Sequence, residues 1–75
     1  MPGEILIHSQ KTTSKNGNQY ELQILQDYKE RILVRKTEII AGIKVPLFET
    51  YVISPYGAVT QFEYLYHEIH NFQLN

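Results

Sequence analysis

Apolar and polar residues alternate along the first two thirds of the chain, which is the period of strands with one buried face. Two such stretches, residues 5–8 and 20–24, flank Asn16-Gly17, the preferred dipeptide of a two-residue hairpin turn. A turn of this length places Ser9 opposite Ile24. In that register one face of the hairpin carries Ile5, Ile7, Tyr20, Leu22 and Ile24.

A third strand is predicted at residues 32–40, which are rich in β-branched side chains. A three-residue loop of Asp27, Tyr28 and Lys29 would join it to the second strand. Because a loop with an odd number of residues preserves the side-chain face, Ile32 and the residues that alternate with it then join the apolar face of the hairpin.

A fourth strand is predicted at residues 47–53, after a turn near Ala41-Gly42. Pro46 lacks the N–H that a sheet requires, which places the start of this strand at an edge or a bulge. Residues 54–57 (Ser-Pro-Tyr-Gly) have the composition of a turn.

The periodicity then becomes helical. Thr60 and Glu63 have the spacing of a capping box, so the helix should begin within a residue or two of Gln61. Apolar residues at intervals of three and four form a single stripe, made of Phe62, Leu65, Ile69 and Phe72.

Together these elements predict one small α+β domain over residues 1–75. Its architecture is a four-stranded antiparallel meander sheet followed by one C-terminal helix packed on one face. The alternative is a small curled β-barrel with a C-terminal helix. A single helix covers only one face of such a sheet, so the composition of the other face distinguishes functions.

The second face is not cleanly polar. The predicted register places His8 and Gln23 on it beside a mixed set of apolar, aromatic and basic residues, which is the composition of a protein interface. The candidate interface residues are Leu6, Leu25, Leu33, Arg35, Tyr51 and Ile53. In the barrel alternative the same side chains are buried inside the fold.

A single-stranded nucleic-acid platform is the second hypothesis for this face. Basic side chains beside an exposed aromatic ring suit unpaired bases, and the candidates are Lys29, Arg31, Arg35 and Tyr51. Two observations count against it. If a three-residue loop joins the third and fourth strands, Glu49 lies opposite Arg35, where an ion pair would use that charge. The chain also has a net charge of −1.

The histidines at positions 67 and 70 raise a third hypothesis, a metal-dependent site on the helix. Zinc-protease helices space their two histidines four residues apart, whereas here the interval is three. His67 is predicted to point away from the apolar stripe and His70 to lie on its flank. We therefore expect no bound metal and no cofactor.

Enzymatic activity is not expected either. His8 and Ser9 are neighbours on a strand, so their side chains point to opposite faces and cannot act as a base and its nucleophile. Ser14 and Ser54 lie in predicted turns without a nearby base, and the isolated glycines form no phosphate-binding loop.

The sequence thus predicts a non-catalytic protein-interaction module that binds a protein partner or itself, with a homodimer favoured. With 75 residues and no cysteine, the chain has no disulfide to stabilise so small a domain. A cytoplasmic location is expected, without a signal peptide or a membrane span. Abundant isoleucine, with alanine only at positions 41 and 58, suggests an AT-rich microbial or phage genome.

Overall fold

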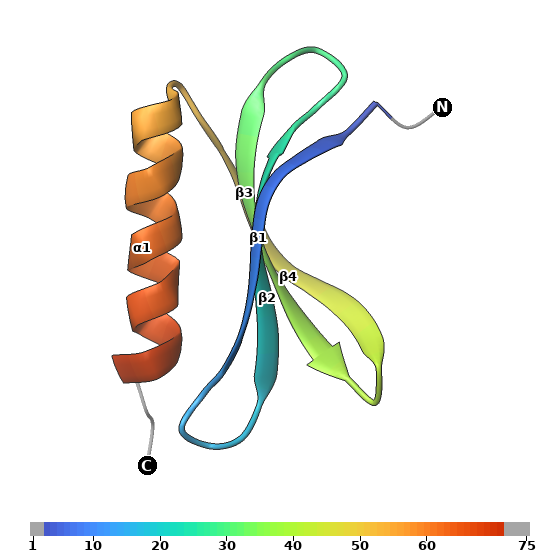
Figure 1. Cartoon of the computed structure of the whole chain (residues 1–75), viewed down its shortest axis with the longest axis vertical. Coiled ribbons are helices and arrows are strands. Elements are labelled where there is room, and N and C mark those ends of the chain that lie inside the picture. Colours follow the sequence, from blue (N-terminus) through green and yellow to red (C-terminus); the bar gives the residue numbers. More distant parts are fainter. Residues whose placement is uncertain (1–2, 72–75) are drawn as a thin grey trace.

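Four strands, arranged in chain order, form one antiparallel sheet that a single helix covers (Figure 1). The computed structural model describes residues 3–71. The sheet is open, and its outer strands are the first and the last. The predicted fold class is therefore confirmed in its open form. The elements are β1 (Ile5–Thr13), β2 (Gln19–Gln26), β3 (Ile32–Ile40), β4 (Ile43–Val52) and α1 (Pro55–Asn71).

The β1–β2 turn differs from the prediction. The Ser14 N–H donates to the Asn18 carbonyl at 2.9 Å, and the Gly17 N–H donates to the Ser14 carbonyl at 3.0 Å. Three residues therefore form the loop, with Gly17 at a φ of 90°, where a side chain would be strained. The longer loop shifts the register by one residue, so Ser9 pairs with Gln23 and not with Ile24.

This shift moves His8 to the helix side of the sheet, because it now pairs with Ile24. The placement of His8 beside the candidate interface was wrong for this reason. A bulge at Ile7 partly restores the predicted arrangement, since Leu6 pairs with Leu25 beyond it.

The β2–β3 loop has the predicted odd length but is displaced by one position. The Asp27 N–H donates to the Arg31 carbonyl and the Glu30 N–H to the Asp27 carbonyl, both at 2.9 Å, so the three loop residues are 28–30. The face is preserved as predicted, because β2 and β3 place their apolar residues together beneath the helix. These residues are Leu22, Ile24, Ile32 and Val34.

Two irregularities determine how β4 pairs with β3. Ala41 and Gly42 form a tight turn with φ values of 53° and 80°. Further along, Leu47 bulges beside Pro46, as the missing N–H of that proline predicted. The bulge shifts the register by one residue and brings Arg35 opposite Glu49.

The helix begins at Pro55, one and a half turns before the predicted start. The Ser54 hydroxyl accepts a hydrogen bond from the Gly57 N–H at 3.1 Å, which makes Ser54 the N-cap. Proline suits the first helical position because its missing N–H would have no partner there. Thr60 lies inside the helix and donates to the Tyr56 carbonyl, so the predicted capping box is not used.

The core lies between α1 and the two central strands. The apolar stripe of the helix packs mainly on β2 and β3, and Ala58 extends the predicted stripe by one turn. Phe72, the last predicted member, lies outside the described residues. No helix within residues 3–71 is long and apolar enough to cross a membrane. The buried helix residues are Ala58, Phe62, Leu65 and Ile69.

The position of the N-cap predicts the effect of two substitutions. Ser54→Ala should lower the free energy of unfolding by about 1 kcal/mol, because the Gly57 N–H loses its partner. Thr60→Ala is the matched control and should change it by less than about 0.5 kcal/mol. Urea unfolding followed by circular dichroism measures both. A larger loss for Thr60→Ala than for Ser54→Ala would contradict the assigned start of the helix.

Candidate protein interface

A row of four apolar residues crosses the face of the sheet that lies away from α1. Each member pairs directly with the next across the four strands, and we call this set the apolar row: Leu6, Leu25, Leu33 and Tyr51. Its two central residues are buried, whereas Leu6 and Tyr51 at its ends are each 52% exposed. Ile53, just after β4, is fully exposed. The candidate interface set is thus divided between buried and exposed side chains.

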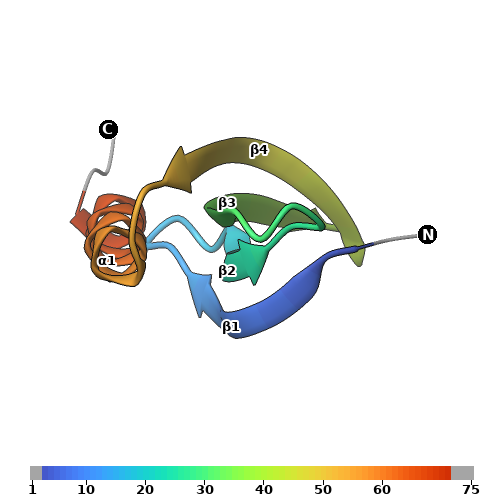
Figure 2. The same ribbon diagram turned by 90° about the horizontal axis from the view of Figure 1, so that it is seen from above.

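Leu25 and Leu33 are buried without a second layer because the sheet curls. Figure 2 shows the first halves of β1 and β4 bending away from α1, so the open face is concave. The chain before β1 adds cover at one end. A Cβ added at Gly3 would overlap the Cβ of Tyr28, so only glycine allows this close approach to the β2–β3 loop.

Arg35 links both outer parts of the sheet across the open face. Its guanidinium lies 2.9 Å from the Glu4 carboxylate and 2.6 Å from the Glu49 carboxylate. Only 19% of the Arg35 side chain is exposed. Burial opposes its charge, but the two carboxylates outweigh that cost and hold the pKa of Arg35 above its ordinary value.

A second polar link crosses the same face. Glu21 is buried on β2, where it accepts a hydrogen bond from the Ser9 hydroxyl at 2.7 Å and forms an ion pair with Lys44 at 2.9 Å. The Lys44 ammonium group and the Ser9 hydroxyl lower the pKa of Glu21 against the effect of burial. Its stabilising effect is therefore present above the ordinary pKa of 4.5 and is lost as the pH falls through the lowered pKa.

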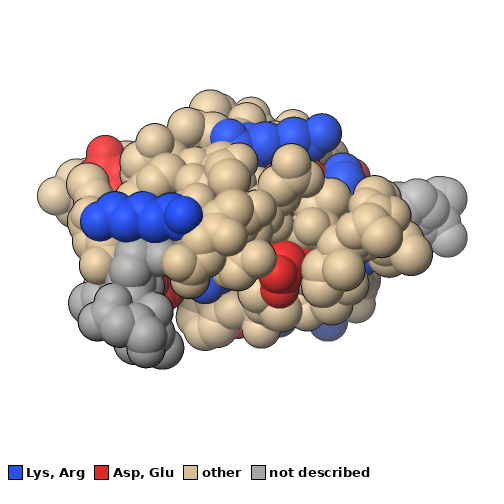
Figure 3. Space-filling model, turned by 90° about the horizontal axis from the view of Figure 1, so that it is seen from below, with Lys and Arg blue, Asp and Glu red and all other residues tan. Residues whose placement is uncertain are grey.

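Of the nucleic-acid candidates, Arg31 and Tyr51 come together, and the charges of Arg31 and Arg35 are already paired. Arg31 forms an ion pair with Asp27 at 2.9 Å, and its guanidinium stacks 4.5 Å from the centre of the Tyr51 ring. One face of that ring is thus covered. Lys29 lies in the β2–β3 loop, as predicted, with its ammonium group 5.6 Å from the centre of the Tyr28 ring. At the end of the molecule seen in Figure 3, Lys and Arg side chains are scattered and form no continuous patch.

Asp27 organises this loop. Its carboxylate accepts hydrogen bonds from the backbone N–H groups of Lys29 and Arg31, each at 2.9 Å, as well as from the Arg31 side chain. Burial alone would raise the pKa of Asp27, but these donors lower it overall. The Arg31 side chain is therefore positioned by the loop itself.

The helix histidines lie where the periodicity predicted. His67 is exposed, and His70 is half-buried with its Nε2 atom 2.6 Å from the Thr12 hydroxyl. The His70 ring also contacts the Tyr66 ring at 4.5 Å. Among residues 3–71, no three histidine or acidic side chains are grouped as metal ligands would be.

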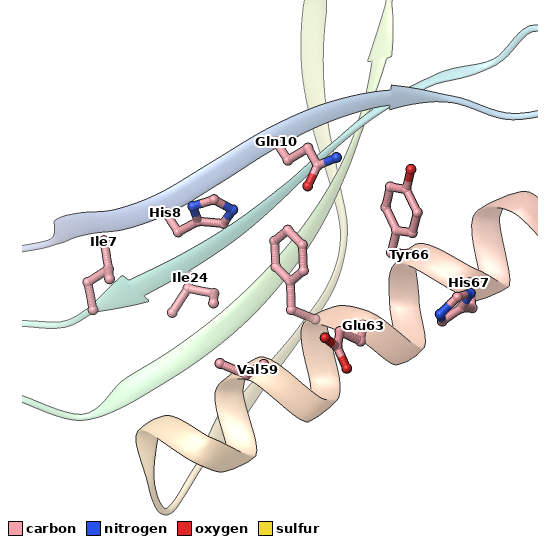
Figure 4. Close-up of a pocket in the computed structure, with 9 residues that line it drawn as sticks. Ile7, His8, Gln10, Ile24, Val59, Glu63, Tyr66 and His67 are labelled. Atoms are coloured by element: carbon pink, nitrogen blue, oxygen red, sulfur yellow. The ribbon is translucent and has the colours of Figure 1, made fainter.

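A groove of about 750 Å³ lies between β1 and α1. This groove was not predicted from the sequence, because the predicted register put His8 on the opposite face. His8 in fact stacks against Phe62, with ring centres 5.2 Å apart. The helix covers this side of the sheet only in part, because it packs mainly on β2 and β3. Figure 4 shows Gln10 of β1 and Tyr66 of α1 on the two sides of the groove.

Comparison of the chain with protein-family models, with curated proteins and with solved structures finds no match. The surface of the described residues is therefore the basis for assigning a function.

The histidine contacts lead to a second prediction. His70→Ala should lower the free energy of unfolding by about 1 kcal/mol, because it removes the partner of the Thr12 hydroxyl. His67→Ala, at an exposed position, should change it by less than about 0.5 kcal/mol. Thermal unfolding with and without zinc checks both values. A melting temperature that rises with zinc in the wild type, but not in a variant that carries both His67→Ala and His70→Ala, would show that the two histidines bind metal.

Proposed function

We propose that the chain is a small non-catalytic protein-interaction module, of the adaptor, regulator or inhibitor type, that self-associates through the open face of its sheet. The observation that carries this proposal is the apolar row, whose buried centre continues outward to the half-exposed side chains of Leu6 and Tyr51. Together with the exposed Ile53, these residues provide apolar surface around a partly buried arginine, which is typical of a protein interface.

The size of the domain favours a second copy as the partner. A chain of 75 residues without cysteine has a small core and no covalent cross-link. Covering the apolar row with the same surface of another copy would stabilise both. Such a contact is self-complementary about a twofold axis, the commonest arrangement in soluble oligomers. The absence of cysteine is compatible with the cytoplasmic location that we propose.

The double variant Leu6→Glu with Ile53→Glu tests the proposal. Both side chains are exposed in the single chain, so the charges should leave its fold intact. In a dimer each substitution loses about 2 kcal/mol of apolar burial at an interface, so the dissociation constant should rise at least about tenfold. Analytical ultracentrifugation over a micromolar concentration series measures the change.

Ile43→Glu is the control, because it places one such charge on an exposed isoleucine at the β3–β4 turn. This variant should form an assembly of the same size as the wild type at each concentration. Leu33 is unsuitable for this test, since it is buried in the single chain and a charge there would unfold it. A wild type that is monomeric at high micromolar concentration would contradict self-association, as would a double variant that stays dimeric.

A further inference from the structure

The outer edge of β1 has backbone groups available to another strand. Residues of an antiparallel edge strand point their N–H and C=O groups alternately toward the neighbouring strand and away from it. Ser14 turns its N–H toward β2, because that group donates to the Asn18 carbonyl. Residues an odd number of positions before Ser14 in the regular part of β1 therefore turn their backbone groups outward. These residues are Ser9, Lys11 and Thr13.

The two edges of the sheet are not equivalent. On β4, Pro46 lacks a donor and Leu47 bulges, and both features obstruct the addition of a strand. On β1 the bulge lies near the start, and the stretch from His8 to Thr13 pairs regularly and contains no proline. An added strand is therefore accepted on β1 more readily than on β4.

The groove between β1 and α1 lies alongside this edge. Its volume of about 750 Å³ lies within the range of ligand sites, about 300–1,000 Å³. Ile24 and Phe62 contribute apolar surface, as do Ile7 and Val59 near one end. An extended segment bound to β1 would direct every second side chain to this face of the sheet, where large apolar residues would lose contact with water.

One charge in the groove defines the partner further. Glu63 is exposed on its helix wall (Figure 4), and its side chain makes no hydrogen bond or ion pair within residues 3–71. The other ionisable side chains that line the groove are His8 and His67, together with the Tyr66 hydroxyl. Glu63 is the one carboxylate among the described residues that line the groove, and its negative charge favours a basic side chain.

We propose that the groove binds an extended segment of a partner protein that pairs with β1 as a fifth strand. The segment carries large apolar residues at alternate positions and a lysine or arginine that meets Glu63. The proposal rests on the role of the chain as an interaction module but not on its self-association, because the open face and this groove are on opposite sides of the sheet.

The probe is a random library of short linear peptides displayed on phage and selected against the immobilised full chain. The dominant peptide is then synthesised with a fluorescent label, and its dissociation constant is measured by polarisation. We expect alternating apolar residues with at least one lysine or arginine. Glu63→Gln should weaken binding about tenfold, whereas Glu38→Gln, which removes the same charge away from the groove, should not.

The backbone contact is tested at position 11. Lys11→Pro removes an outward N–H, whereas Lys11→Ala removes the same charge and keeps the N–H. The dissociation constant for Lys11→Pro should therefore be about tenfold higher than for Lys11→Ala. Circular dichroism confirms that both variants are folded. If Lys11→Pro does not fold, Glu63→Gln alone decides, because that side chain is exposed and makes no hydrogen bond or ion pair within the described residues.

Three results would overturn the proposal. The first is a selection that enriches no sequence, and the second is a peptide that binds the Glu63 and Lys11 variants as tightly as the wild type. The third is a wild type that forms a dimer and a Lys11→Pro variant that does not. The occupant of the β1 edge would then be a second copy. The measured mass of the wild type reports on self-association separately, so the failure of one proposal is distinguishable from failure of the other.

Discussion

Arg35 bridges two carboxylates that lie on either side of it, and the shape of the open face depends on this contact. Glu4 reaches it from the segment before β1 and Glu49 from β4, so the bridge spans the sheet. An arginine shared by two carboxylates in a partly buried position holds its neighbours more firmly than an isolated surface pair does. The sheet therefore remains curled, and Leu25 and Leu33 are buried on a face that no helix covers.

The same curl leaves other apolar groups exposed. Because β1 bends away from α1, the helix packs mainly on β2 and β3, and a groove stays open beside β1. The ends of the apolar row face solvent for a related reason, since they lie on the two outer strands. A closed barrel would have no outer strands, and a flat sheet would expose the whole row. The half-curled sheet provides both proposed binding surfaces.

The sequence predicted the elements and most faces correctly, because these depend on periodicity over many residues. Turn lengths were harder to predict. Asn16-Gly17 is compatible with a two-residue turn and with the three-residue loop that places Gly17 at a positive φ, and that difference moved His8 across the sheet. The pairing of Arg35 with Glu49 was right although its predicted three-residue loop was wrong. The bulge at Leu47 supplies the same one-residue shift.

The start of the helix was ambiguous in a similar way. Ser54-Pro55 and Thr60 each offer a favourable N-terminus, and the earlier one allows Ala58 to join the core. The burial of Leu25 and Leu33 had no signal in the local pattern, since it depends on the curl of the sheet and on contacts between residues distant in sequence, such as Glu4 with Arg35 and Gly3 with Tyr28. The groove could be predicted only from the correct register of β1.

Amide hydrogen exchange over a dilution series, followed by mass spectrometry, tests most directly whether another copy covers the apolar row. Coverage by another copy predicts that fragments containing Leu6 and Tyr51 exchange faster as the protein is diluted. A fragment around Leu65, which is buried within the single chain, should exchange at a constant rate. Exchange at Leu6 and Tyr51 that is fast and independent of concentration would contradict it.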